Sequence, residues 1–386
     1  MRILRYLTAG ESHGPALTGI LEGVPAGLKV LASDIAVQLA RRRRGHGRGN
    51  RMKIEDDAVD IVGGVRRGET IGAPVALLIR NKDFKNWEEV MRVAPGGTPK
   101  RVVRVPRPGH ADLVGALKYG RSDLRDVLER ASARETTMRV ALATVARLLL
   151  AELGITVGSR VAAIAGVVDE TPLPGLSGAR LSARTDASPV RCLGRAAEAA
   201  MIAAIDAAKA AGDTVGGVVE AVATGLPSGL GSYAQWDRRL EGDLAKAVMS
   251  LNAIKGVEVG LGFDGAARRG SEVHDAFFWN ATRTKVTRRT NRSGGIDGGI
   301  TTGEPLIVRA AMKPIATLMD PLPSVNLETR ATAKAHIERS DACAVPAAAV
   351  IVESLVCLVL ADHVLVKYGG DSMKELKAHH AASAKA

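Results

Sequence analysis

Short apolar segments punctuated by glycine alternate along this chain with longer stretches of helical periodicity. Segments of strand length lie at residues 3–7, 216–224 and 306–312, and the clearest helical patterns cover 134–153 and 196–211. Apolar residues recur at intervals of three and four in the long segments, whereas the short ones are apolar throughout. This alternation predicts a mixed α/β (α+β) fold and excludes an all-helical or all-strand chain.

The domain organisation follows from length and from the spread of the glycine-rich motifs. The 386 residues suffice for one large domain or two ordinary ones. Glycine-rich motifs of similar chemistry lie on both sides of the segment 169–188, which is rich in Pro, Gly, Ser and Thr. We therefore expect a single large catalytic domain over residues 1–370, with 169–188 as an exposed insertion. Residues 371–386, rich in Ala, Lys and His, are expected to form a frayed C-terminal tail.

Cysteine usage and hydropathy exclude several classes of protein. Cys192, Cys343 and Cys357 are far apart or on an apolar stretch, so neither a disulfide framework nor a metal site is expected. The N-terminus has no apolar leader segment, and the apolar run 345–366 is interrupted by polar residues and a proline. That run is expected to be a buried helix rather than a membrane span. A cytoplasmic location is the resulting expectation.

A formal net charge of +12 is consistent with a polyanionic partner, an acidic membrane surface or a site for a phosphorylated small substrate. The densest basic segment is 41–51, which reads RRRRGHGRGNR and follows a helix expected to start at an N-cap Ser33. A run of arginines is usually a solvated face or a nucleic-acid patch. Here glycines at alternate positions would let the backbone and the Arg48 and Arg51 side chains approach one small anion. A small-anion site is therefore favoured over nucleic acid, and only 3% of the residues are aromatic, which leaves few stacking platforms for bases.

Five further segments carry candidate chemistry. In segment 8–15, TAGESHGP, a Ser–His pair in a tight loop follows a strand, so that Ser12 can donate a hydrogen bond and His13 can act as a general acid. In 106–112, two prolines and a glycine stiffen the backbone around an arginine and a histidine. Segment 130–137 places small residues ahead of a helix, where free amides favour an anion. The glycine-dense 293–303 could approach a planar ring or a phosphate closely, and 338–341 offers an Arg–Asp pair.

One glycine-rich motif matches a cofactor-binding pattern by sequence but not by context. Residues 260–265, GLGFDG, match the dinucleotide-binding pattern, but no apolar helix leading to a second strand follows them. We interpret this segment as a tight loop.

Together these segments resemble the chorismate synthase family, in order and spacing, over roughly residues 2–370. The matching blocks are TAGESHGPAL, RRRRGHGRGNRMKIE, GAPVALLIRNKD, RPGHADL, ERASARETTMR, GDTVGGVVE, GLGSYAQWD, GGIDGGITTG, MKPIATL and ERSDACAVPAA. The resemblance implies a β-α-β-α sandwich assembled as a homotetramer. It also implies an anti-1,4-elimination of phosphate from 5-enolpyruvylshikimate 3-phosphate that gives chorismate and requires reduced FMN without net redox change.

The resemblance assigns roles to individual residues. It implies catalytic roles for His13, which would protonate the leaving phosphate or its surroundings, for His110, which would manage a proton at the flavin pyrimidine edge, and for Asp341, which would handle a proton near the flavin. Its implied substrate contacts are Ser12, Arg42, Arg48, Arg51, Arg107, Arg134 and Arg339. Its implied FMN contacts are Arg130, Ala131, Ser132, Asn252, Ala253, Gly298, Lys313, Pro314, Ile315, Ala316, Thr317 and Arg339. Arg42 and Arg48 are also the implied NADP contacts.

Two alternatives to the lyase remain open from the residues alone. A basic nucleic-acid-binding protein would use the segment 41–51. A flavoprotein oxidoreductase would turn over NADPH, but no part of the chain resembles a separate reductase domain, so flavin reduced elsewhere is expected. His46 stands where family members often have Tyr, which argues for a packing position rather than a catalytic one.

Overall fold

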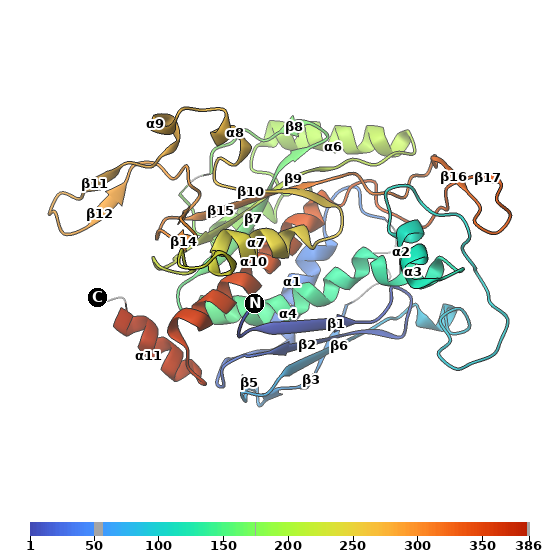
Figure 1. Ribbon diagram of the computed structural model, residues 1–386, viewed down its shortest axis with the longest axis horizontal. Coiled ribbons are helices and arrows are strands. Elements are labelled where there is room, and N and C mark those ends of the chain that lie inside the picture. The colour runs from blue at the N-terminus through green and yellow to red at the C-terminus, as the bar shows by residue number, and fades with distance from the viewer. Residues whose placement is uncertain (50–56, 174, 384–386) are drawn as a thin grey trace.

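Four layers alternate between sheet and helix in the computed structural model, which describes residues 1–49, 57–173 and 175–383 (Figure 1). The first layer is an antiparallel sheet in the order β1-β2-β6-β3. Its strands are β1 (Arg5–Ala9), β2 (Ala16–Glu22), β6 (Val75–Arg80) and β3 (Val59–Gly63). Burial alternates along β2 and β6, because one face of the sheet meets the helices and the other is open.

The second sheet is also antiparallel, in the order β10-β15-β9-β7-β8. Its strands are β10 (Ile254–Val259), β15 (Leu306–Met312), β9 (Gly217–Thr224), β7 (Thr156–Ile164) and β8 (Val167–Val168). The central strands β7 and β9 are buried along nearly their whole length rather than at alternate residues. Such continuous burial arises because helices cover both faces of this sheet (Figure 1).

Three helices fill the space between the sheets: α1 (Ala32–Arg43), α4 (Thr136–Ala151) and α10 (Val345–Tyr368). Helix α4 packs on β2 and β6, and α10 packs on β7, β9 and α4. By length and composition α10 could cross a membrane, but 94% of its most apolar window is buried inside the protein. The expectation of a buried core helix at 345–366 is confirmed.

The outer helical layer and the flanks complete the fold. Helices α5 (Gly178–Thr185) and α6 (Arg195–Ala210) contact β7, and α7 (Leu240–Met249) contacts β10 and α10. Helices α2 (Asp112–Tyr119) and α3 (Arg125–Ala131) precede α4. The remaining elements are β4 (Val65–Arg66), β5 (Glu69–Thr70), η2 (Phe84–Asn86), η3 (Ala133–Glu135), η4 (Trp236–Arg238), α8 (Phe263–Ala266), α9 (Gly270–Val273), β11 (Phe277–Trp279), β12 (Val286–Arg288), β13 (Ile296–Asp297), β14 (Ile300–Thr301), β16 (Pro323–Val325), β17 (Thr332–Lys334) and α11 (Met373–Ser383).

Several expectations from the sequence can be compared with these elements. The α+β class and the sandwich are confirmed, the strand expected at 306–312 has those bounds as β15, and the glycine motif at 260 forms a turn in which Gly260 and Gly262 have φ of +61° and +54°. All three cysteines are free and buried, as expected.

Three local expectations differ from the structure. Ser33 is not the N-cap of α1, because the helix already begins at Ala32 and Leu31 precedes it. Residues 178–185 within the expected surface insertion form α5, whose Leu181 and Thr185 are buried against the second sheet. The described part of the tail forms α11, because Leu376 and Met373 give it an apolar side to bury.

Candidate active site

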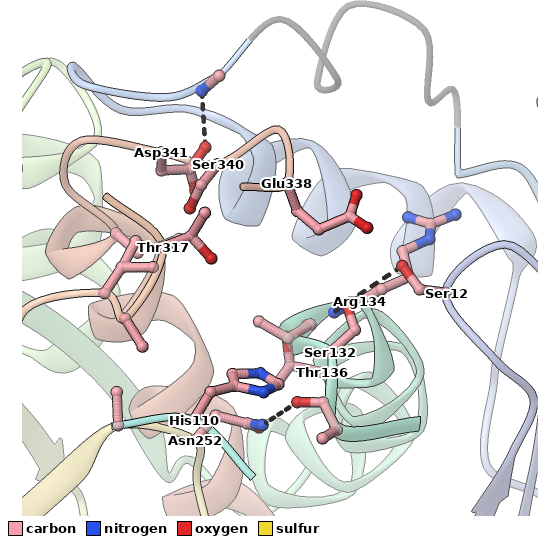
Figure 2. Close-up of a pocket in the computed structure, with 18 of the residues that line it drawn as sticks. Ser12, His110, Ser132, Arg134, Thr136, Asn252, Thr317, Glu338, Ser340 and Asp341 are labelled. Atoms are coloured by element: carbon pink, nitrogen blue, oxygen red, sulfur yellow. Dashed lines mark hydrogen bonds between the residues drawn. The ribbon is translucent and has the colours of Figure 1, made fainter. Parts of the chain in front are cut away.

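A cavity of about 430 Å³ opens where the loops of both halves of the chain meet the ends of α1, α3, α4 and α10. Figure 2 shows ten labelled side chains around this space, among them Ser12, His110, Asn252, Thr317 and Asp341, which come from five different segments. Among the residues that the structure describes, six cationic side chains line the cavity: Arg42, Arg48, Arg107, Arg134, Lys313 and Arg339. A volume in this range is typical of small-molecule sites.

The arginine run divides between the core and the cavity. Arg41 is buried and donates to Glu353 of α10, with an Nη1–Oε1 distance of 2.7 Å. Arg42 is 4% exposed, lines the cavity and donates to the Ala133 carbonyl and the Thr136 hydroxyl. Arg41 and Arg42 are therefore buried rather than displayed on a surface, which argues against the nucleic-acid alternative.

The glycine loop after α1 holds Asp341. The Gly49 amide donates to Oδ1 of Asp341 and the Arg48 guanidinium donates to Oδ2, each at 2.6 Å. A Cβ at Gly49 would lie 2.9 Å from the Ser340 carbonyl oxygen, so a larger residue would force the loops apart. Arg51 lies outside the described residues.

His13 pairs with a buried carboxylate from α3. Its Nδ1 lies 2.8 Å from Oε1 of Glu129, and its backbone amide donates to Oε2 of the same side chain. Although burial alone would raise the pKa of Glu129, hydrogen bonds from His13 and Arg125 outweigh it and lower that pKa. The ring of His13 stacks on Trp87 with centroids 3.6 Å apart.

His110 has the same kind of partner. Its Nδ1 lies 2.6 Å from Oδ1 of Asp112, which also accepts hydrogen bonds from Arg107. Burial acts to raise the pKa of Asp112, but the hydrogen bonds and charges of His110 and Arg107 hold it well below its usual range. Arg107 also donates to Thr317, which ties the 106–112 loop to the segment after β15.

The start of α4 supplies hydroxyl groups and an arginine. Ser132 Oγ donates to Ser12 Oγ at 3.1 Å and accepts from the Arg134 backbone amide. Arg134 forms a close ion pair with the buried Asp57. Helix α4 itself begins at Thr136 rather than at Arg134, because the 3₁₀ turn η3 comes first.

Two loops of the second half of the chain also line the cavity. One follows α7 and contains Asn252 and Ala253, and the other follows β15 and contains Lys313. The Lys313 ammonium donates to the Gly109 carbonyl, and the Lys313 amide donates to the Ala253 carbonyl, both at 2.9 Å. Ala253 has φ of +66°, a left-handed conformation that is uncommon for a residue with a Cβ and that often marks a functional site. Next to it, Asn252 donates to the Ala131 carbonyl.

Most side chains predicted from the sequence line this one cavity. They are Ser12, His13, Arg42, Arg48, Arg107, His110, Ala131, Ser132, Arg134, Asn252, Ala253, Lys313, Ile315, Ala316, Thr317, Arg339 and Asp341.

Three predicted positions are placed differently. Arg130 points away and donates to the Thr8 and Gly10 carbonyls, Gly298 lies in the β13–β14 turn, and Pro314 is not part of the lining. The arginine and the aspartate of the 338–341 segment each have a partner from another segment: Asp341 binds Arg48, and the Arg339 guanidinium lies 3.8 Å from the Asp83 carboxylate.

Sequence reasoning missed the apolar wall and one acid. Ala347, Ala348 and Ile351 of α10 and its N-cap Ala344 line the cavity, and their spacing of three and four residues was the available signal. Glu338 also lines it, and hydrogen bonds from His336 and Arg125 outweigh its burial and lower its pKa to about 2. His46, in contrast, pairs with Asp206 and is not part of the lining.

A cavity with this many cations and two histidines held by carboxylates defines an enzyme that acts on an anionic small molecule. The chain matches the sequence profile of the family described as chorismate synthase over residues 4–365. It is 54% identical over 376 residues to "Chorismate synthase" of Bacillus cytotoxicus, covering 96% of each chain, and 52% identical to "Chorismate synthase" of Brevibacillus brevis, covering 97% of each. A solved structure titled "Crystal Structure of Chorismate Synthase" superposes with a TM-score of 0.80 at 39% identity, covering 100% of this chain and 98% of the other.

The chain therefore belongs to the chorismate synthase family. It is a carbon–oxygen lyase acting on a phosphate ester, and its reaction is the anti-1,4-elimination of phosphate from 5-enolpyruvylshikimate 3-phosphate to give chorismate. This is the last common step of the shikimate pathway to the aromatic amino acids. Members of the family use a flavin cofactor.

Proposed function

We propose that the cavity binds 5-enolpyruvylshikimate 3-phosphate together with reduced FMN, and that His13, His110 and Asp341 handle the protons of the elimination. The observation that carries the proposal is the meeting of six cationic side chains and two carboxylate-bound histidines in one cavity. The catalytic domain would span residues 1–370.

The substrate's charge accounts for the cations. It carries a phosphate and two carboxylates, and burying these groups without paired cations would be prohibitive. Arg42, Arg48, Arg107, Arg134 and Arg339 line the cavity, and guanidinium groups bind such anions in bidentate fashion. We assign them, with Ser12 and the undescribed Arg51, to substrate binding.

The elimination breaks a carbon–oxygen bond, releases phosphate and removes one proton from the ring carbon. The cations would stabilise charge on the departing phosphate, and His13 would protonate that phosphate or its surroundings. His110 would hold a proton at its Nε2, since Asp112 engages Nδ1. Asp341 would take up a proton once Arg48 or Gly49 releases one of its oxygens.

The residues present fit a flavin. Small and apolar side chains of α10 (Ala344, Ala347, Ala348 and Ile351) offer a flat surface to a planar ring, and Ala253 brings its backbone close to the cavity in a left-handed conformation. Ala131, Ser132, Asn252, Lys313, Ile315, Ala316, Thr317 and Arg339 would also hold the cofactor, and Arg130, Gly298 and Pro314 stay predicted contacts. When bound, reduced FMN supplies transient electron donation to the substrate.

We propose further that the flavin is reduced outside this chain. Arg42 and Arg48 would be the contacts for NADP if it binds, but their side chains already engage Thr136, the Ala133 carbonyl and Asp341 within the cavity. Steady NADPH oxidation by the pure protein with catalytic FMN would overturn this part.

We also propose a cytoplasmic homotetramer. The open face of the first sheet exposes Leu7 and Ile20, which are paired across β1 and β2 and are 76% and 47% exposed. Adjacent exposed apolar residues of this kind are often covered by another chain. Light scattering after size-exclusion chromatography would measure the mass, and a monomer at micromolar concentration would contradict the tetramer.

A fluorescence titration with FMN tests the cofactor assignment. Lys313→Ala removes a cation that lines the cavity, whereas Lys255→Ala removes an exposed lysine of β10 and serves as the matched control. We expect Lys313→Ala to weaken FMN binding by about tenfold, as loss of one charge-assisted hydrogen bond predicts. An unchanged dissociation constant would remove Lys313 from the FMN site.

A further inference from the structure

Glu129 binds the Ser12–His13 loop through both its side chain and its backbone, and the mechanism proposed above gives it no role. Its Oε1 and Oε2 lie 2.8 and 3.0 Å from Nδ1 of His13, its Oε2 accepts from the His13 amide, and its carbonyl accepts from the Ser12 amide. The side chain is 1% exposed and is not part of the cavity lining. It therefore touches the histidine from behind the cavity and does not reach the substrate.

Protonation at Nδ1 follows from this geometry. A buried carboxylate bound to Arg125 at 3.0 Å is ionised, and an ionised carboxylate can only accept hydrogen bonds. Nδ1 of His13 must then be the donor, in the neutral ring as well as in the charged one. Nε2 is consequently the ring nitrogen that is left for a group in the cavity.

The ring is also prevented from turning over. One face of the ring stacks on Trp87 at an interplanar angle of 18°. Trp87 is itself 5% exposed and donates from Nε1 to Asp83. A flip of the imidazole would exchange its ring nitrogens with carbons, break the Nδ1–Glu129 bond and leave a buried carboxylate without its partner, which is costly.

We propose that Glu129 is a positioning residue for the elimination: it keeps a proton on Nδ1 of His13, so that Nε2 alone exchanges a proton with the substrate. The inference rests on the proposed role of His13 as the acid. In this role Glu129 would act as carboxylates do beside other catalytic histidines: it would orient the ring and compensate the charge of the imidazolium.

The charged groups around the ring come from two elements. Glu129 and Arg125 belong to α3, and Asp83 and Arg101 flank Trp87 in the 81–101 segment, where the Arg101 guanidinium lies 4.3 Å from the Trp87 ring centroid. Of these four charged groups, Glu129 is the one that is hydrogen-bonded to the His13 ring.

The direct test is solid-state ¹⁵N NMR of histidine-labelled wild-type protein, in which the His13 ring signals are identified by their loss in His13→Gln. We expect the neutral His13 ring to carry its proton on Nδ1 and none on Nε2. A neutral ring with its proton on Nε2 would overturn the proposal, whatever any variant does.

Kinetics supply the second readout. For Glu129→Gln we expect kcat to fall about 10- to 100-fold with little change in KM, and the alkaline fall of kcat to move to lower pH by about one unit. Glu129→Asp should restore part of the rate. Glu220→Gln is the matched control, because Glu220 is also buried in an ion pair, with Arg160, but lies on β9 away from the cavity.

The outcomes separate two failures. If His13→Gln is inactive while Glu129→Gln keeps the wild-type kcat and pH profile, only the positioning role is wrong. If His13→Gln is fully active, the proposed role of His13 fails and the inference fails with it.

Discussion

Replacing Glu353 by Gln should destabilise the protein far more than replacing an exposed glutamate. Glu353 is 0% exposed in the middle of α10 and accepts from Arg41, Arg147 and Ser159. The charges of these arginines hold its pKa well below the usual range in spite of complete burial. The substitution keeps the shape of the side chain and removes the charge that compensates the guanidinium groups.

The size of the expected destabilisation depends on which partners Arg41 and Arg147 keep when Glu353 loses its charge. Breaking a buried ion pair by removing one partner costs about 3–5 kcal/mol. Arg41 keeps Asp186 at 2.8 Å, and the Arg147 side chain is 19% exposed and can reach water. We therefore expect the lower end, a loss of about 3 kcal/mol in the free energy of unfolding.

Urea unfolding followed by circular dichroism measures this loss, with wild type and variant at the same protein concentration because the proposed assembly would contribute to stability. Glu22→Gln is the control: its partner Arg5 is exposed, and such pairs contribute at most about 1 kcal/mol. Equal destabilisation by the two variants would refute the reasoning that the Arg41 end of the arginine run is structural.

Three further predictions concern the cavity and the thiols. His13→Ala and His110→Ala should each lose well over tenfold in turnover while still binding FMN, measured by steady-state rate and fluorescence titration; full activity in either would remove that histidine from proton transfer. Arg48→Ala should mainly weaken substrate binding, and equal binding by calorimetry would assign the glycine loop another purpose. Cys343 and Cys357 should resist alkylation in the native protein near pH 8, because burial raises the pKa of each to about 11, and labelling within minutes seen by mass spectrometry would contradict their burial.

The sequence predicted the long periodic elements well and their ends less well. The helical pattern at 134–153 became α4, Thr136–Ala151, because its apolar stripe is continuous and packs on both α10 and the first sheet. The start of α1 was misplaced by two positions, because Ser33 was expected to be the N-cap and the N-cap is Leu31, whose amide donates to the Asp34 carboxylate. Local propensity alone does not distinguish these two starts.

The motifs predicted which residues line the site, but they did not predict which of these residues bind one another. Arg41 and Arg42 are adjacent in sequence yet serve different places, because successive residues on a helix point about 100° apart. Which of them faces Glu353 depends on where α10 lies. The pairings of His13 with Glu129 and of Arg48 with Asp341 join segments more than a hundred residues apart, so no local pattern could reveal them.

The most direct test of the central claim is an anaerobic turnover experiment. The purified protein is mixed with photoreduced FMN and 5-enolpyruvylshikimate 3-phosphate, and chorismate absorbance and phosphate release are followed in parallel. The account predicts chorismate and phosphate in equal amounts with reduced FMN, and no product with oxidised FMN. Folded, flavin-bound protein that forms no chorismate would contradict it, and the cations of the cavity would then need a different anion.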